Sequence, residues 1–148
     1  MSLWDYLVRA ASAWFMGFFP LLEIYLAVPA AIALGLDYVS AVVWSVLGNF
    51  SVVPLVIFFY GQLMRVEPLR RWLERRNTAR WQRAMDRYGA WFVLLMTPLL
   101  GVWAMAAMAQ AAGMSRVRLL TSSLTSITVY AVAIAVGIAL GVDVLTHK

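Results

Sequence analysis

Apolar residues fill four long stretches of the chain, and short polar segments separate them. The stretches cover residues 10–35, 38–64, 89–113 and 119–142. Each is long enough to cross the roughly 30 Å hydrocarbon core of a bilayer as a helix. The pattern predicts an all-α integral membrane protein in which one membrane domain uses the whole chain, residues 1–148.

Proline and glycine interrupt two of the four stretches. Pro20 and Pro29 fall in the first stretch, and Pro98 and Gly101 fall in the third. Proline lacks the backbone donor that a helix uses, and in a membrane the carbonyl group left free must find a partner within the protein or in a wet cavity. We therefore predict helix breaks at these four residues, giving two Pro-broken re-entrant helical hairpins plus two transmembrane helices.

The two halves of the chain resemble one another at a spacing of 78 residues. The sequence Pro-Leu-Leu occurs at residues 20–22 and again at 98–100. Corresponding helix breaks in two halves are typical of transporters built from inverted repeats, whose sites lie where the broken helices meet. We expect repeat 1 at about residues 10–64 and repeat 2 at about 89–142; the alternative is chance, because these residue types are common in membrane helices. Further matches are Ala31 with Ala109, Ala33 with Ala111, Gly35 with Gly113 and Ser45 with Ser123.

The connection between the two halves, residues 65–88, is strongly basic. Its eight arginines and three acids give it a net charge of +5, which equals the net charge of the whole chain. The positive-inside rule places this connection in the cytoplasm, at the inner (plasma) membrane of a bacterial-type cell. Helical spacing of its apolar residues predicts amphipathic surface helices interrupted around Asn77 and Thr78. A nucleic-acid partner is unnecessary to explain the charge.

Two topologies are consistent with the basic residues. In a four-span topology Arg9, Lys148 and the arginines of residues 65–88 are cytoplasmic, ten in all, with Arg116 and Arg118 outside. If the first and third stretches are re-entrant, Arg116 and Arg118 move inside and Arg9 and Lys148 move outside, which again gives ten against two. The prolines favour the re-entrant topology. The ten-to-two distribution of basic residues argues against insertion of the chain in both orientations. It favours a homodimer of two chains in the same orientation.

Glu23 is the main candidate for a functional residue. It is the only acid in residues 10–35 and lies between two prolines. Ionised side chains at bilayer depth are costly and mark transport pathways, proton relays or counter-ion sites. Desolvation favours the neutral form of a carboxylic acid, so such a residue can bind and release a proton near physiological pH. A structural acid that accepts backbone hydrogen bonds at the helix breaks is the alternative.

Further residues are candidates for substrate contact. Asn49 can line a polar path beside Glu23, although a hydrogen bond between helices explains it equally well. Tyr25 and Trp103 lie deep in their apolar stretches and can meet an apolar substrate. Hydroxyl residues between positions 121 and 128 could hold a chain of water molecules, although we expect them to bond their own backbone or a neighbouring helix. Candidates for contact with a head group or phosphate are Arg65, Arg87, Arg116 and Arg118.

The residues around Glu23 resemble the family of small multi-drug export proteins. The resemblance rests on the run from Pro20 to Gly35 and on Gly48-Asn49 in the next stretch, followed by the basic connection and by Pro98 to Gly101. The resemblance, through the related DedA membrane proteins, implies hairpins packed tip to tip and proton-coupled movement of a lipid carrier; the family name implies drug export. Tyr25, Met96 and Leu100 depart from the arginines that such relatives place there, so no acid–arginine pair is carried over.

We therefore expect a proton-coupled membrane transporter that moves a lipid-phosphate carrier or another amphipathic substrate. The alternatives are a proton-driven exporter of cationic drugs and a non-transporting protein that shapes or assembles membranes. The chain contains no cysteine and no catalytic motif, so we expect neither an enzyme nor a cofactor. His147 is the only histidine and has no ligand cluster around it in the sequence, so no metal site is expected.

Overall fold

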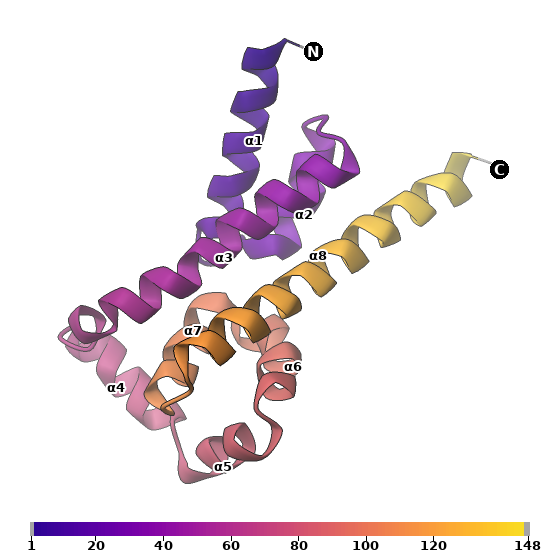
Figure 1. Cartoon of the computed structure of the whole chain (residues 1–148). Coiled ribbons are helices and arrows are strands. Elements are labelled where there is room, and N and C mark those ends of the chain that lie inside the picture. Colours follow the sequence, from indigo (N-terminus) through magenta and orange to yellow (C-terminus); the bar gives the residue numbers. More distant parts are fainter. Residues whose placement is uncertain (1, 147–148) are drawn as a thin grey trace. The chain divides into compact units, whose positions relative to one another are not determined.

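The computed structural model describes residues 2–146. This part of the chain forms eight helices and no strand (Figure 1), which confirms the all-α prediction. The helices are α1 (Leu3–Phe18), α2 (Glu23–Ala33), α3 (Tyr38–Leu63), α4 (Glu67–Arg76), α5 (Ala79–Tyr88), α6 (Ala90–Leu100), α7 (Val102–Ala111) and α8 (Arg116–Thr146).

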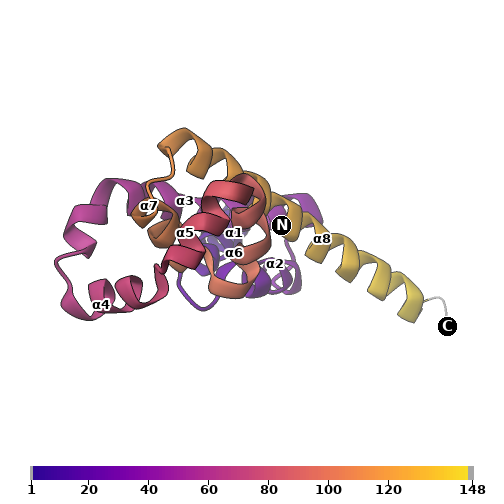
Figure 2. The ribbon, with the colours of Figure 1, turned by 90° about the horizontal axis from the view of Figure 1, so that it is seen from below.

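Among the described residues, α3 and α8 are the two helices that are long and apolar enough to cross a membrane. Figure 2 shows α8 as one unbroken helix. The apolar helices α2, α6 and α7 have only 10 or 11 residues each. At 1.5 Å per residue each is roughly 16 Å long, about half the thickness of the hydrocarbon core. These lengths agree with two crossing helices, while a re-entrant path for the shorter helices stays a prediction.

Helix α1 begins earlier than the apolar pattern indicated. The first apolar stretch starts at residue 10, whereas α1 starts at Leu3. Ser2 and Asp5 form a capping box, in which the Asp5 amide donates to Ser2 Oγ at 3.1 Å and the Ser2 amide donates to the Asp5 carboxylate at 3.2 Å. This cap satisfies amide groups that have no partner within the first turn, so the helix can start in a polar segment.

The interruptions of the two broken stretches lie near Pro20 and at Gly101. Helix α1 ends at Phe18 and α2 starts at Glu23, and between them the chain turns with Leu21 at φ 87°. Helix α6 passes into α7 through Gly101, at φ 81° and ψ 156°, a conformation available essentially to glycine alone. Helix α1 packs against α2, and α6 packs against α7, so each broken stretch forms a helical hairpin.

Pro29 and Pro98 do not break their helices, and this part of the prediction was wrong. Pro29 lies inside α2 and Pro98 inside α6. Pro98 lacks the amide N–H that would bond the carbonyl of Leu94 in a regular helix. Ser126 Oγ donates a hydrogen bond to that carbonyl at 3.3 Å. A side chain from another helix thus compensates for the proline, which allows α6 to continue.

The turn that follows the second helix of each hairpin occurs twice, 78 residues apart. Each turn is a helix C-cap with a glycine at positive φ, 90° at Gly35 and 79° at Gly113. In both copies the residue after the glycine donates to a carbonyl five residues back, a bond typical of the Schellman motif. These bonds join Leu36 N to Ala31 O at 3.1 Å and Met114 N to Ala109 O at 3.0 Å.

The helix that follows each turn also starts with an equivalent N-cap. The Ser40 amide donates to the Asp37 carboxylate at 2.9 Å before α3, and the Arg118 amide donates to Ser115 Oγ at 3.4 Å before α8. Residues 31–41 and 109–119 therefore share their local backbone structure. The resemblance between the halves extends from sequence to local conformation, whereas their inverse orientation stays a prediction.

The basic connection forms the two amphipathic helices that the spacing predicts. Pro68 lies in the first turn of α4, and Asn77 ends that helix before Thr78 begins α5. Leu73 and Met85 are the buried residues of these helices. The arginines between them are exposed, so α4 and α5 each have one apolar face and one charged face.

The chain divides into two compact units. Unit 1 holds α1, α2, the first part of α3 and the last part of α8, within residues 1–49 and 127–148. Unit 2, residues 50–126, holds the remaining parts of both long helices together with α4 to α7. Each unit thus combines one hairpin with parts of both long helices, whereas the predicted division at residues 10–64, 65–88 and 89–142 follows the order of the repeats.

Small residues form the core of unit 1. Ala13, Ala31 and Ala41 are fully buried around Leu36, and they allow α1, α2 and α3 to approach closely. Trp44 Nε1 of α3 donates to Tyr6 Oη of α1 at 3.0 Å. The hairpin of unit 1 is therefore held against α3 by close packing and by a polar contact at one end.

Candidate functional site

Glu23 lies inside unit 1, at the start of α2. Only 7% of its surface is exposed. The first turn of a helix presents unpaired amide groups and a partial positive charge, which stabilise a carboxylate there. The one acid of this apolar stretch is therefore a buried residue at the start of a helix.

The backbone of Glu23 is strained. Its φ is 43°, a left-handed value that costs a residue with a side chain about 1–2 kcal/mol. The residue 78 positions later is Gly101, whose φ of 81° is also positive. Both hairpins thus have a positive φ at this aligned position, where the first has a side chain and the second has none. Residues held in costly conformations cluster at functional sites, which makes Glu23 a functional candidate on structural grounds.

Asn49 bonds the end of α1. Its Nδ2 donates to the carbonyl oxygen of Gly17 at 3.0 Å, and the Asn49 side chain is buried. Gly17 lies in the last turn of α1, where carbonyl groups have no amide partner within the helix. The structure thus gives Asn49 the helix-to-helix hydrogen bond that was one of its two predicted roles. The bond holds the end of α1 from which the chain turns toward Glu23.

Two glycines bring α1 and α3 into backbone contact at this point. A Cβ atom at Gly48 would overlap the carbonyl oxygen of Trp14, and a Cβ atom at Gly17 would overlap the carbonyl oxygen of Ser45. Neither position has room for a side chain. Sequence reasoning missed Gly17, although its spacing from the buried Ala10 and Ala13 forms the small-residue face that such contacts use.

Two more buried polar groups lie in unit 1. Tyr25 Oη and Ser45 Oγ are buried and, within the described chain, have no hydrogen-bond partner. Unpaired buried polar atoms are uncommon and costly, so they mark places where water or a bound molecule completes the hydrogen bonding. Tyr25 also lies close enough to Glu23 and Tyr130 to interact with them electrostatically. Ser45 was noticed in the sequence only as a repeat match.

Trp103 belongs to unit 2 and lies in a different environment from Tyr25. It lines an apolar cavity of about 220 Å³ together with Trp72 of α4 and Val56 of α3. The guanidinium group of Arg76 stacks on the Trp72 ring, 5.0 Å from its centre. Trp103 and Tyr25 are thus parts of separate units, each with its own surroundings, and the shared site predicted for them stays a prediction.

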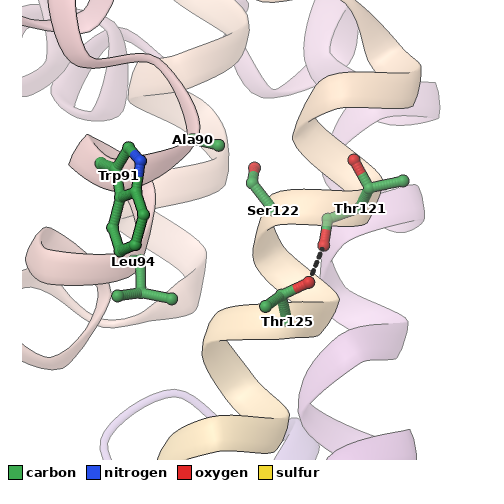
Figure 3. A pocket seen from close by; sticks show the side chains of 6 residues that line it. All are labelled: Ala90, Trp91, Leu94, Thr121, Ser122 and Thr125. Carbon is green, nitrogen blue, oxygen red and sulfur yellow. Dashed lines mark hydrogen bonds between the residues drawn. The ribbon is translucent and has the colours of Figure 1, made fainter.

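A second cavity of unit 2 lies between α6 and the hydroxyl-rich part of α8. Figure 3 shows Trp91 and Leu94 of α6 across from Ser122 and Thr125 of α8. The space between these helices is about 340 Å³, and Thr121 also lines it. The three hydroxyl groups donate to carbonyl groups of their own helix, at 2.9 Å from Thr121 to Val117, 2.7 Å from Ser122 to Arg118 and 2.9 Å from Thr125 to Thr121. These hydroxyls serve the helix, as predicted, and the cavity wall is mostly apolar.

The four arginines proposed for head-group contact are exposed and lie at helix ends. Arg65 follows α3, Arg87 is in the last turn of α5, and Arg116 and Arg118 are in the first turn of α8. The Arg87 guanidinium lies 5.6 Å from the centre of the Tyr88 ring. Such positions suit side chains that reach into the head-group region.

Within the described residues, no group of three acidic or histidine side chains is placed to hold a metal ion. His147 lies outside the described residues.

Comparison with known protein families identifies a match. The family model described as "Putative small multi-drug export protein" matches residues 23–132, from the start of α2 through the break at Gly101 into α8. No curated protein and no solved structure matches the chain. Because the match covers most of the chain, including α2 to α7 and the basic connection, the protein belongs to the family of small multi-drug export proteins.

Proposed function

We propose that the protein is a proton-coupled transporter that moves an amphipathic molecule across the inner membrane, with Glu23 as the group that binds and releases the proton. One observation carries this proposal: the protein keeps a buried carboxylate at φ 43°, where the corresponding position of the second hairpin is a glycine. A structural role at a helix start is served equally by a neutral capping residue or by glycine itself. Retention of the acid at a conformational cost favours a role in function.

The unpaired hydroxyl groups of Tyr25 and Ser45 support a polar path in unit 1. An amphipathic substrate or a chain of waters would satisfy these groups during a transport cycle. In this proposal both hairpins are re-entrant, α3 and α8 cross the membrane, and residues 65–88 lie in the cytoplasm. A transporter whose discontinuous helices meet near the midplane then binds substrate and proton at that level.

A lipid-phosphate carrier is the substrate that we propose first. The exposed arginines at the ends of α3, α5 and α8 would attract its phosphate group to the cytoplasmic surface. A cationic drug is the second candidate, because the family is described as a multi-drug exporter. In that case Glu23 binds drug and proton alternately, and the driving force is the proton gradient.

Two copies of the chain would complete the pathway. Ala133, Gly137 and Gly141 form an exposed small-residue face of α8, and a Cβ atom at Gly137 or Gly141 would meet nothing within 4 Å. Such faces let membrane helices associate closely. Because the chain contains no cysteine, the single substitution Gly137→Cys tests the dimer: oxidative cross-linking in membranes is expected, and a chain that stays monomeric under oxidation rejects this interface.

Transport into proteoliposomes under an imposed pH gradient tests the main proposal. We compare the wild type with Glu23→Gln, which keeps the shape of the side chain but cannot release a proton. Glu74→Gln removes an exposed acid of α4 and serves as the matched control. A fluorescent polyprenyl phosphate and a cationic dye are the two substrates.

Gradient-driven movement of one substrate, reduced at least tenfold by Glu23→Gln and preserved by Glu74→Gln, is expected. Which substrate moves decides between the lipid-phosphate carrier and the drug. Movement that Glu23→Gln leaves unchanged rejects Glu23 as the coupling residue. Traces equal to those of empty vesicles for both substrates favour a protein that shapes or assembles membranes without transport.

A further inference from the structure

The two copies of the repeated turn differ in what covers them. In unit 1 the Arg9 guanidinium covers the turn at Gly35, donating from Nη1 to the Gly35 carbonyl at 3.1 Å. A Cβ atom at Gly35 would overlap this guanidinium group. The cationic side chain thus satisfies a carbonyl group at the negatively polarised end of α2.

In unit 2 the corresponding turn is open. The residue 78 positions after Arg9 is Arg87, and its guanidinium group lies on the Tyr88 ring instead. A Cβ atom at Gly113 would meet nothing within 4 Å. The space beside Gly113 is a cavity of about 290 Å³ between the end of α5 and the turn that joins α7 to α8. The turn at Gly35 is therefore covered by the Arg9 side chain, whereas the matching turn at Gly113 borders a cavity.

The cavity carries one charge of each sign. Asp86 of α5 and Arg118 of α8 both line it, with Ser115 between α7 and α8. Arg118 reaches toward the end of α5, because a Cβ atom at Gly89 would lie 4.0 Å from its Nη1. Met85 and Met114 add apolar surface. A ligand with a single charge would match one wall and be repelled by the other, whereas a zwitterion would match both.

The positions of the charges indicate which group of a zwitterion lies where. The carbonyl group of Gly113, which corresponds to that of Gly35, and the Asp86 carboxylate are groups that can accept N–H donors, as the Gly35 carbonyl does from Arg9. The start of α8 and the Arg118 guanidinium favour an anion such as a phosphate. Helix α5 has one apolar face, which suits a place at the surface of a membrane.

We propose that this cavity binds a phosphoethanolamine group, with its ammonium at Gly113 and Asp86 and its phosphate at Arg118. The ammonium takes the place that the Arg9 guanidinium occupies in the first copy of the turn. A choline group is excluded because its methylated nitrogen has no N–H to donate, and a phosphoglycerol group is excluded because it lacks the cation. The cavity does not involve Glu23, although Arg118 is also one of the arginines proposed above to attract a phosphate group.

Binding of soluble head groups to the purified full chain in detergent tests the site. The probes are glycerophosphoethanolamine, glycerophosphocholine and glycerophosphoglycerol, followed by thermal shift and by microscale thermophoresis. We expect glycerophosphoethanolamine to bind at least tenfold more tightly than the other two. Asp86→Asn and Arg118→Gln are each expected to weaken it at least tenfold. Glu74→Gln and Arg83→Gln remove equally exposed charges that do not line the cavity, and they are expected to bind like the wild type.

Reconstitution separates a lipid source from a free small molecule. In phosphatidylcholine nanodiscs, added phosphatidylethanolamine is expected to compete with the soluble probe if the group belongs to a lipid. Unaltered probe binding assigns the site to a soluble phosphoethanolamine compound. Equal binding of all three probes, or binding that Asp86→Asn leaves intact in a correctly folded variant, overturns the proposal.

Discussion

The hairpin of α1 and α2 and the hairpin of α6 and α7 solve one backbone problem in two ways. Both place a positive φ near the start of the second helix, and both end that helix with the same glycine turn. The second hairpin uses Gly101 at the strained position, whereas the first uses Glu23. In the second hairpin a residue without a side chain has the positive φ. In the function proposed above, the carboxylate of the first hairpin is the group that binds and releases the proton.

The hairpins also differ in how a long helix contacts them. In unit 1, Gly17 and Gly48 bring the backbones together and Asn49 bonds the Gly17 carbonyl. The positions 78 residues later are Leu95, Ser126 and Ile127. In unit 2 the hydroxyl of Ser126 makes the bond, to the Leu94 carbonyl. The contact in unit 1 is closer than the contact in unit 2. We therefore expect substitutions in unit 1 to lower the stability more than the matching substitutions in unit 2.

The largest effect is expected for Gly48→Ser, which gives unit 1 the residue that unit 2 has at the corresponding place. The new Cβ would overlap the Trp14 carbonyl oxygen, so the helices must move apart. We expect a loss of about 3 kcal/mol in the free energy of unfolding, measured by thermal unfolding in detergent. Gly61→Ser, on the same helix with nothing within 4 Å, is the control and should be nearly neutral. Equal stability of both variants would show that the contact is loose.

A smaller loss is expected for Asn49→Leu. Leucine has a similar size but no donor, so the buried Gly17 carbonyl loses its bond, at a cost of about 2 kcal/mol. The matching change in unit 2 is Ser126→Ala. Its longer bond of 3.3 Å is worth only about 0.6 kcal/mol, the average for side-chain bonds in membrane helices. Chemical unfolding in mixed micelles measures both, and a larger loss for Ser126→Ala would reverse the comparison.

Glu23 offers a test in which the sign of the effect is unusual. At an ordinary helix position alanine is more stable than glycine by about 1 kcal/mol. At φ 43° the order should reverse, so we expect Glu23→Gly to be more stable than Glu23→Ala by about 1 kcal/mol. Both variants lack the carboxylate, so their difference reports the backbone alone. If Glu23→Ala unfolds at the higher temperature, the residue is unstrained and the structural case for its function is lost.

The smallest effect concerns the caps of the two long helices. Hydrogen bonds from Ser40, first from its side chain and then from its amide, hold the pKa of Asp37 below its usual 3.8. A lowered pKa contributes stability that is present above the unfolded-state value and is lost as the pH falls through the folded-state value. Ser115, the counterpart before α8, does not titrate. Between about pH 5 and pH 3, we expect Asp37→Asn to lose less stability than the wild type.

The control for this measurement transfers the acid to the other half. Ser115→Asp places a carboxylate at the corresponding cap and is expected to make the acid-induced loss of stability larger. Thermal unfolding across the pH range, with Asp37→Asn and Ser115→Asp side by side, measures both changes. Parallel curves for all three proteins would mean that these caps contribute nothing to the pH dependence.

The local sequence pattern alone predicted many of the helices of this protein and its main candidate residue. The lengths of the apolar stretches predicted α3 and α8 closely, because a crossing helix needs a continuous apolar surface. Helical spacing predicted α4 and α5, and the isolated acid in residues 10–35 pointed to Glu23. The early start of α1 was also readable, since Ser2 and Asp5 have the spacing of a capping box.

Tertiary structure decided which interruptions break a helix and which residues meet. Pro98 is tolerated because Ser126, far along the chain, donates to the carbonyl that the proline leaves free. The strain at Glu23, the contact of Gly17 with α3 and the covering of Gly35 by Arg9 likewise depend on neighbours from other helices. The residue pattern shows which side chains prefer an apolar environment and which prefer water. Packing between segments that are distant in sequence decides which group bonds a backbone carbonyl that proline leaves without a partner.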